Sequence, residues 1–215
     1  MVLNIQRKFA DYGGLSFSIN LTYFMQQIAN NILVLQPGDQ MPPNTQDSIK
    51  IYLGGTVDFG SQENDWQGKF MQGMINLTDP YKGLIMFKNA NIIFLNPKIY
   101  PTSNAAPALD NPEFVQQMQW RLQMQDMADV VFLNLLMKSK SYVPILEFGS
   151  LVQSNKLIVR ASENYMLYPQ IRLYCEKFNI PLLTGKTTVK DVILTMGSFL
   201  PKIKDLNDPN NKLPE

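Results

Sequence analysis

The stretch that decides the fold is Ile51-Tyr52-Leu53-Gly54-Gly55-Thr56-Val57-Asp58, in which an apolar run of strand length ends in paired glycines and a polar loop. Open α/β sheets make room for a ligand in this way, because glycine turns the backbone sharply and leaves the volume of a side chain empty. A tight turn between a strand and a helix explains Gly54 and Gly55 equally well. The stretch therefore predicts a sheet edge that is suited to a nucleotide-sized pocket.

Strand and helix patterns alternate from residue 49 to residue 200. The clearest helix start is Asn111-Pro112-Glu113, which supplies an N-cap, a first-turn proline and a first-turn acid. Five strands separated by helices predict an α/β fold with a doubly wound, five-stranded parallel sheet covered on both faces. We expect strands at 49–54, 91–96, 129–136, 156–160 and 180–183, and helices at 64–76, 111–127, 144–154, 168–177 and 188–200.

Both ends of the chain differ in pattern from this central part. Residues 1–46 contain a run with period two at 15–19 and a short apolar run at 32–35, which predict an N-terminal extension that forms a hairpin or a cap. Residues 201–215 are rich in Asn, Pro and Lys and predict a frayed polar tail. We therefore divide the chain into an extension (1–46), an α/β domain (47–200) and a tail (201–215).

Composition excludes several classes of function. The 215 residues carry a net charge of +1, so we expect no general binding of nucleic acid. The chain contains no histidine, which excludes hydrolase triads, histidine-ligated metals and imidazole proton shuttles. Carboxylates, Tyr, Lys, Arg and backbone dipoles remain to carry out any catalysis, and we expect no metal and no cofactor.

The single cysteine, Cys175, excludes an internal disulfide framework and a cysteine-based zinc site. We expect no secretory signal at residues 1–12, because Arg7, Lys8 and Asp11 bring charges into this stretch and it has no apolar block. No run reaches the roughly 18 apolar residues that a spanning helix needs. We expect a cytoplasmic protein with no membrane partner.

Glu147 is the most informative single residue, because it places a carboxylate in the apolar run Pro144-Ile145-Leu146-Glu147-Phe148-Gly149-Ser150. Burial of an acid is costly unless its charge is used, and stabilisation of an oxocarbenium ion at a sugar carbon is one such use. The alternative is a simple preference of helix N-termini for acids. Asn134 is polar in an otherwise apolar strand and is a second pocket candidate.

Five blocks of the sequence occur in order along the chain: Tyr52–Asp58 with Asp65-Trp66-Gln67, Leu95–Lys98, Asp110–Phe114 with Trp120, Ala128–Val131, and Leu146–Gly149. Together they resemble the nucleoside 2-deoxyribosyltransferase family, over about residues 49–183. The resemblance implies a flavodoxin-like strand order, a homo-oligomer, and a glutamate nucleophile at Glu147 that attacks C1′ of a 2′-deoxyribonucleoside and displaces its base. The partners it implies are a nucleoside or nucleotide and a free base.

Two positions depart from the family pattern. The family commonly has a carboxylate eight residues before the aspartate that begins the third strand, and counting back from Asp129 gives Arg121. A cation there suggests another substrate, for example one with a phosphate that Arg121 would bind. Many members also have an aspartate six residues before the nucleophile, where this chain has Ser141. The acid that protonates the base is therefore unassigned, and its candidates are Asp58, Asp110 and Asp126.

Several candidates also have purely structural explanations. Trp66 and Trp120 are either core residues or stack on a base, and Asn111 is either an N-cap or a sugar contact. The residues expected to bind substrate are Gly54, Gly55, Asp58, Trp66, Asp110, Asn111, Arg121, Asn134 and Ser141.

Three hypotheses of function remain open. The first is an enzyme that transfers or hydrolyses the glycosidic bond of deoxynucleosides or their monophosphates through Glu147, with a second base or water as acceptor. The second is a nucleotide-binding module without turnover. The third is an interaction protein that uses residues 1–46 as a docking or assembly surface.

Overall fold

A computed structural model describes residues 32–56, 65–78, 91–98, 107–136 and 142–197. The chain separates into two compact units, Met1–Ile32 and Leu33–Glu215, and everything described here, apart from Ile32, belongs to the second unit. The run expected at 15–19 and the tail at 201–215 lie outside the described residues.

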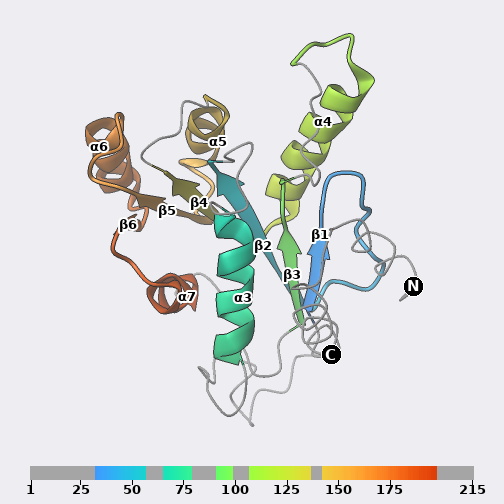
Figure 1. The fold of residues 1–215 in the computed structure, drawn as a ribbon, viewed down its shortest axis with the longest axis horizontal. Coiled ribbons are helices and arrows are strands. Elements are labelled where there is room, and N and C mark those ends of the chain that lie inside the picture. The colour runs from blue at the N-terminus through green and yellow to red at the C-terminus, as the bar shows by residue number, and fades with distance from the viewer. Residues whose placement is uncertain (1–31, 57–64, 79–90, 99–106, 137–141, 198–215) are drawn as a thin grey trace, which may run out of the picture. The chain divides into compact units, whose positions relative to one another are not determined.

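The core of the described unit is a six-stranded sheet whose spatial order is β1-β3-β2-β4-β5-β6 (Figure 1). β2 pairs in parallel with β3 and β4, and the pairs β4–β5 and β5–β6 are also parallel. The five strands after β1 follow the flavodoxin-like order and confirm the predicted doubly wound fold. The strands are β1 (Ile32–Leu35), β2 (Ser48–Gly55), β3 (Asn91–Leu95), β4 (Val130–Leu135), β5 (Leu157–Ala161) and β6 (Leu182–Thr184).

The predicted strand count of five is wrong, because the apolar run 32–35 joins this sheet as its outermost strand, β1. The Asn96 amide, just after β3, donates to the Leu35 carbonyl. Beyond β1, the Gln36 amide side chain donates to the Lys98 carbonyl, and the Trp120 indole donates to the Asp39 carbonyl. β1 is missed from sequence because no crossover helix links it to β2, so nothing in the local pattern marks it as part of the sheet.

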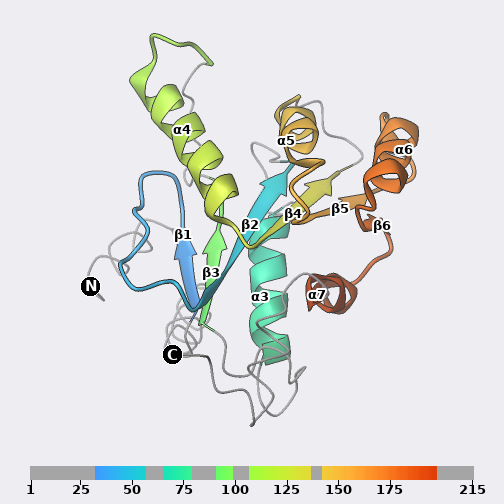
Figure 2. The same cartoon turned by 180° about the vertical axis from the view of Figure 1, so that it is seen from behind.

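Helices cover both faces of the sheet, as expected for strands that are apolar on both sides. Trp120 of α4, Phe148 of α5 and Ile171 of α6 belong to one core cluster with Tyr52 and Leu133. On the other face α3 packs its Phe70 ring on Phe132 at 5.0 Å, beside α7 (Figure 2). The helices are α3 (Trp66–Thr78), α4 (Pro112–Met127), α5 (Val143–Leu151), α6 (Tyr168–Phe178) and α7 (Val189–Gly197).

The start of α4 follows the predicted signal. The Asn111 side chain accepts hydrogen bonds from the backbone amides of Glu113 and Phe114, so the predicted N-cap of α4 is confirmed.

At the other end of the connection that contains α4, Lys50 and Asp129 link β2 to the start of β4. The Asp129 amide donates to the Lys50 carbonyl, and the Lys50 amide donates to the Asp129 side chain. These contacts fix where α4 runs along the sheet and therefore which of its side chains reach α5.

Candidate functional site

Glu147 lies on α5 above the carboxyl-terminal half of β2, with 7% of its surface exposed. Its carboxylate accepts three hydrogen bonds. The Tyr52 hydroxyl donates to Oε1 at 2.9 Å and the Gln125 amide donates to the same oxygen at 3.0 Å, while the Gly55 backbone amide donates to Oε2 at 3.2 Å. Both oxygens are thus held by donors, an arrangement that suits the ionised form of the acid.

The pKa of Glu147 is raised from its ordinary value because burial removes the carboxylate from water. The positive charge of Arg121 opposes this shift most strongly, followed by the hydrogen bonds from Tyr52, Gly55 and Gln125. Burial also raises the pKa of the Tyr52 hydroxyl well above its ordinary value, and the Glu147 charge adds to this effect. Tyr52 therefore keeps its proton at neutral pH and acts as a donor.

The two glycines at the end of β2 make the space that the carboxylate occupies. A Cβ at Gly54 would lie 3.2 Å from Glu147 Oε2 and 2.8 Å from a ring carbon of Tyr52. Gly55 has φ +110°, and a Cβ there would clash with the Asn134 carbonyl. Gly54 thus admits the acid and Gly55 turns its amide towards it.

Asn134 is buried next to this edge and holds the end of the sheet together. Its backbone carbonyl accepts the Thr56 amide at 2.9 Å, and its side-chain oxygen accepts a hydrogen bond from Arg160 at 3.1 Å. Arg160 also donates to the Gly185 carbonyl, and partial burial lowers the pKa of its guanidinium. The side-chain oxygen of Asn134 is therefore already used within the protein.

Arg121 is on α4, one helical turn before Gln125, and its charge acts on both Glu147 and Tyr52. One of its terminal nitrogens donates to the Pro97 carbonyl at 3.3 Å. Its Nε is buried without an acceptor among the residues that the structure describes. The cation that departs from the family pattern thus belongs to the surroundings of Glu147.

Three of the predicted site residues lie away from Glu147. Asp110 is exposed to solvent. Its neighbour Asn111 caps α4 and precedes Gln125, a hydrogen-bond partner of Glu147, by fourteen residues, which corresponds to roughly 20 Å along a helix. Asp126 is also exposed, and its carbonyl accepts a hydrogen bond from Lys156 just before β5, at the amino edge of the sheet. Neither acid is therefore brought to the carboxylate of Glu147 by the fold.

The two tryptophans have structural roles. The Trp66 indole donates to the Thr56 carbonyl at 2.6 Å, and its ring meets Phe132 edge-on on the face opposite Glu147. Trp120 is buried in the core that α4 shares with the sheet. Near Trp66, Asp65 forms an ion pair with Lys98 at 3.1 Å. These contacts favour the core interpretation over stacking on a base.

Asp58 and Ser141, two further predicted substrate contacts, lie outside the described residues. Within the described ranges, no group of three acidic or cysteine side chains is placed to bind a metal ion, and no helix is both long and apolar enough to cross a membrane. The described part of the site therefore consists of Glu147 on α5 and the residues of β2 and α4 that surround it.

Tyr52 and Gln125 are the site residues that sequence reasoning missed. Tyr52 sits in an apolar strand, where a buried hydroxyl needs a partner, and two-residue periodicity places it on the same face as Gly54. Gln125 is four residues after Arg121, so the two share a face of the predicted helix. Both signals are present in the sequence, but only the crossing of α4 and α5 over β2 shows that they meet at Glu147.

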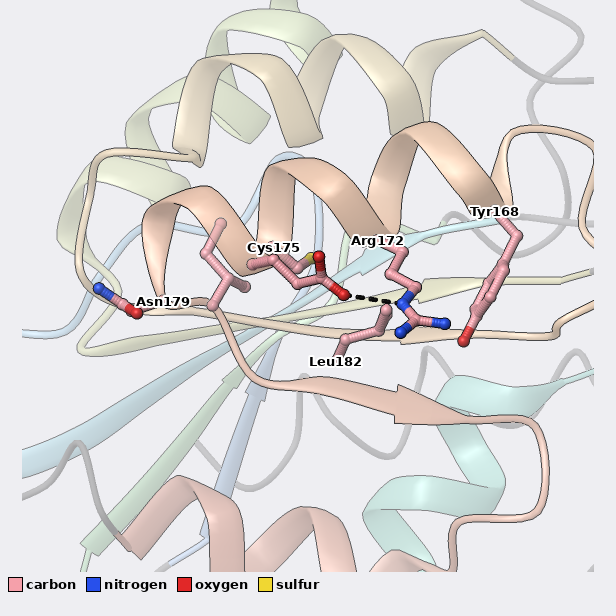
Figure 3. Close-up of a pocket in the computed structure, with 7 residues that line it drawn as sticks. Tyr168, Arg172, Cys175, Asn179 and Leu182 are labelled. Atoms are coloured by element: carbon pink, nitrogen blue, oxygen red, sulfur yellow. Dashed lines mark hydrogen bonds and ion pairs between the residues drawn. The ribbon is translucent and has the colours of Figure 1, made fainter.

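A separate cavity of about 390 Å³ lies along α6 and is lined by Tyr168, Arg172, Cys175, Glu176, Asn179, Ile180 and Leu182. Figure 3 shows Arg172, Cys175 and Asn179 of this helix region beside Leu182. None of these side chains is a hydrogen-bond partner of Glu147. The cavity is therefore not the site that the sequence pattern predicted.

The fold and the site define a doubly wound α/β protein of flavodoxin-like order that holds a buried glutamate above its central strand. The family described as nucleoside 2-deoxyribosyltransferase like matches residues 48–165, which is more than half of the chain. The chain belongs to this family, and the resemblance inferred from its sequence is confirmed. Among curated proteins, none matches the chain.

Proposed function

We propose that this protein cleaves or transfers the N-glycosidic bond of 2′-deoxyribonucleosides or their monophosphates, with Glu147 as the nucleophile. The observation that carries the proposal is the Glu147 carboxylate held by three hydrogen-bond donors at the end of the central strand. Family membership supports a nucleoside-type substrate. The proposal thus joins a substrate class from the family to an acid whose surroundings suit attack on a sugar carbon.

The reaction has two steps. In the first, a carboxylate oxygen of Glu147 forms a bond to C1′ while the bond from C1′ to the base nitrogen breaks, and the base leaves with the bonding electron pair. In the second, water or another base attacks C1′ and releases the carboxylate. Water gives hydrolysis and a second base gives transfer. No cofactor is required by either step.

The donors around Glu147 have a specific function in this scheme. Oε1 accepts from Tyr52 and Gln125, so its charge is stabilised, while Oε2 accepts only the longer bond from Gly55. We assign the attack on C1′ to Oε2, because it has fewer and weaker hydrogen bonds to lose. The space opened by Gly54 lies against the same oxygen.

A single incubation tests the proposal. The protein is mixed with deoxynucleosides, deoxynucleoside monophosphates and free bases, and the products are separated by chromatography. We expect base release or exchange that falls by at least about 10³-fold in Glu147→Ala and Glu147→Gln, since a nucleophile is lost. Glu163→Gln, which neutralises an exposed carboxylate, is the matched control and keeps full activity. Unchanged turnover in either Glu147 variant contradicts the proposal.

The competing function is nucleotide binding without turnover. The feature that favours it is the presence of Arg121 and Ser141 at positions where the family prefers acids. This alternative predicts that a nucleotide raises the melting temperature while no product forms. Detection of any free base in the same samples rejects it.

We also propose that the protein acts as a homo-oligomer, as the family resemblance implies. Tyr142 and Leu146, one turn apart at the start of α5, are 80% and 71% exposed, which is unusual for large apolar side chains beside a site. Sedimentation velocity of the wild type should show an oligomer that Leu146→Glu weakens. A wild type that sediments as a monomer at all concentrations contradicts this proposal.

A further inference from the structure

Within the proposed function, on which this inference rests, the fate of the departing base is the open chemical question. A base that leaves with an electron pair must be protonated or must have its negative charge stabilised. Among the described residues, the acids that are candidates for protonation, Asp110 and Asp126, lie away from Glu147. The charged side chain that acts on Glu147 is a cation, Arg121.

Arg121 is partly buried, and its guanidinium nitrogens differ in their surroundings. Among the ion pairs of the described ranges none involves Arg121, although Glu147 is close enough for its charge to be felt. Its Nε is buried and has no acceptor among the residues that the structure describes. One of its terminal nitrogens donates a hydrogen bond to the Pro97 carbonyl. A buried donor without a partner is destabilising, and more so when the group is charged. The terminal donors of the guanidinium that the Pro97 carbonyl does not use are suited to an acceptor that arrives with the substrate.

We propose that Arg121 is a catalytic residue that stabilises the departing base as an anion by hydrogen bonds to its oxygen, in place of protonation by an acid. The bond from C1′ to the base nitrogen breaks as the Glu147 oxygen bonds to C1′, and the electron pair spreads from that nitrogen onto the carbonyl oxygen of the base. The guanidinium donates to this oxygen and keeps all its protons. After release, the base takes its proton from water.

The proposal assigns Arg121 to the base and not to a 5′-phosphate, for a reason of connectivity. The leaving nitrogen is bonded directly to C1′, the atom that Glu147 attacks, whereas a 5′-phosphate is several bonds further along the sugar. Arg121 lies one helical turn before Gln125, whose amide donates to Glu147, so its guanidinium belongs to the surroundings of C1′, the atom to which the base is attached. Anchorage on Pro97 keeps the guanidinium in this place before the substrate binds.

A consequence is a preference for oxo bases. Uracil, thymine and hypoxanthine carry an oxygen that accepts from a guanidinium and spreads the negative charge, whereas adenine has no such oxygen and departs best when protonated. We expect turnover of 2′-deoxyuridine, thymidine or 2′-deoxyinosine, and little with 2′-deoxyadenosine. An enzyme that acts only on 2′-deoxyadenosine overturns the proposal.

The decisive kinetic test compares leaving groups of graded acidity. The substrates are thymidine, 2′-deoxyuridine and 5-fluoro-2′-deoxyuridine, in the wild type, Arg121→Lys and Arg121→Met. We expect kcat/KM to fall by about 10²- to 10³-fold in Arg121→Met, as for other lost donors to a developing charge. The fall should be smallest for the 5-fluoro substrate, whose base is the most stable anion, so the dependence on leaving-group acidity becomes steeper. Arg121→Lys should lie between the two.

Two results would overturn the assignment. An equal loss for all three substrates indicates that Arg121 only shapes the site. A loss confined to the corresponding 5′-monophosphates indicates that Arg121 binds phosphate. Glu163→Gln is again the control for a change of charge outside the site.

A binding experiment separates this inference from the proposed function. In Glu147→Gln protein, which cannot form the covalent bond, the affinity for free 5-fluorouracil should rise with pH as this base ionises. The rise should be abolished when Arg121→Met is added. A rise that persists without Arg121 contradicts the inference even if Glu147 is the nucleophile. An inactive wild type that shows the Arg121-dependent rise contradicts the proposed function and leaves Arg121 as a binding residue for an anionic base.

Discussion

The hydroxyl of Tyr52 lies 2.9 Å from the carboxylate of Glu147, although 95 residues separate them along the chain. The bond links the middle of the central strand to the second turn of a helix above it. Because both groups are buried, the hydrogen bond is stronger than it would be in water, and the cost of losing it is greater. The pair is therefore a sensitive place to test the site.

Tyr52→Phe removes the hydrogen bond that lowers the pKa of Glu147 and should raise this pKa further. A hydrogen bond to a charged group contributes about 1.5–3 kcal/mol, so the acidic limb of kcat/KM should move up by about one pH unit or more. The measurement is a pH profile of base release. Tyr174→Phe, at a half-exposed position on α6, is the control. An unmoved limb shows that Tyr52 does not tune the nucleophile.

Glu147→Gln should change how stability depends on pH. The folded protein binds the Glu147 proton more tightly than the unfolded chain, because the folded pKa is raised. The wild type therefore gains stability relative to Glu147→Gln as pH falls, fully so below the unfolded pKa of about 4.3, and loses it as pH rises through the folded pKa. A folded pKa that lies one pH unit above the unfolded pKa corresponds to about 1.4 kcal/mol. Urea unfolding at several pH values measures the difference, and a flat difference refutes the assignment.

Gly55→Ala should destabilise the protein by more than about 1 kcal/mol, because its φ of +110° is strained for alanine and the new Cβ meets the Asn134 carbonyl. Gly149→Ala is a matched control, since it lies within α5 and its Cβ would meet nothing within 4 Å. That change should stabilise by about 0.5–1 kcal/mol. Melting curves of the two variants that coincide would contradict this account.

Asn111→Ala should cost about 1 kcal/mol of stability, because the amides of Glu113 and Phe114 lose their acceptor. Its kcat/KM should stay close to that of the wild type under conditions where both are folded, since Asn111 lies at the far end of α4 from Gln125. Asn111→Asp, which keeps an acceptor, should recover most of the stability. A large rise in KM without loss of stability would restore the sugar-contact hypothesis.

Much of the fold could be predicted because local signals and tertiary structure agree. The Asn111 cap, the apolar strands and the glycines after Leu53 each have one local solution, and the structure adopts it. β1 could not be predicted as part of the sheet, because four apolar residues without a crossover helix do not specify a neighbour. Pairing with β3 depends on which edge of the finished sheet is open, and no local signal carries that information.

The sequence alone could predict Glu147 as the central residue of the candidate site, but not the residues that hydrogen-bond to it. Glu147 stands out because its charge contradicts the apolar run around it, and the blocks around it carry the family resemblance. Its hydrogen-bond partners come from β2 and α4, so their identity depends on how three elements cross. Asp110 and Asp126 are candidates by residue type alone. The length of α4 separates Asp110 from Glu147, and Asp126 is exposed to solvent although its neighbour Gln125 is buried against Glu147.

The position of β1 also bears on how the protein can be shortened. The family match begins at residue 48, but a chain cut there would lose the strand that occupies the outer side of β3. The unpaired backbone amides and carbonyls of β3 would then be exposed to water. An exposed strand edge promotes aggregation, because strands of other molecules can pair with it. The Trp120 indole would lose its acceptor at Asp39 as well. A stable truncated protein should therefore start upstream of Ile32.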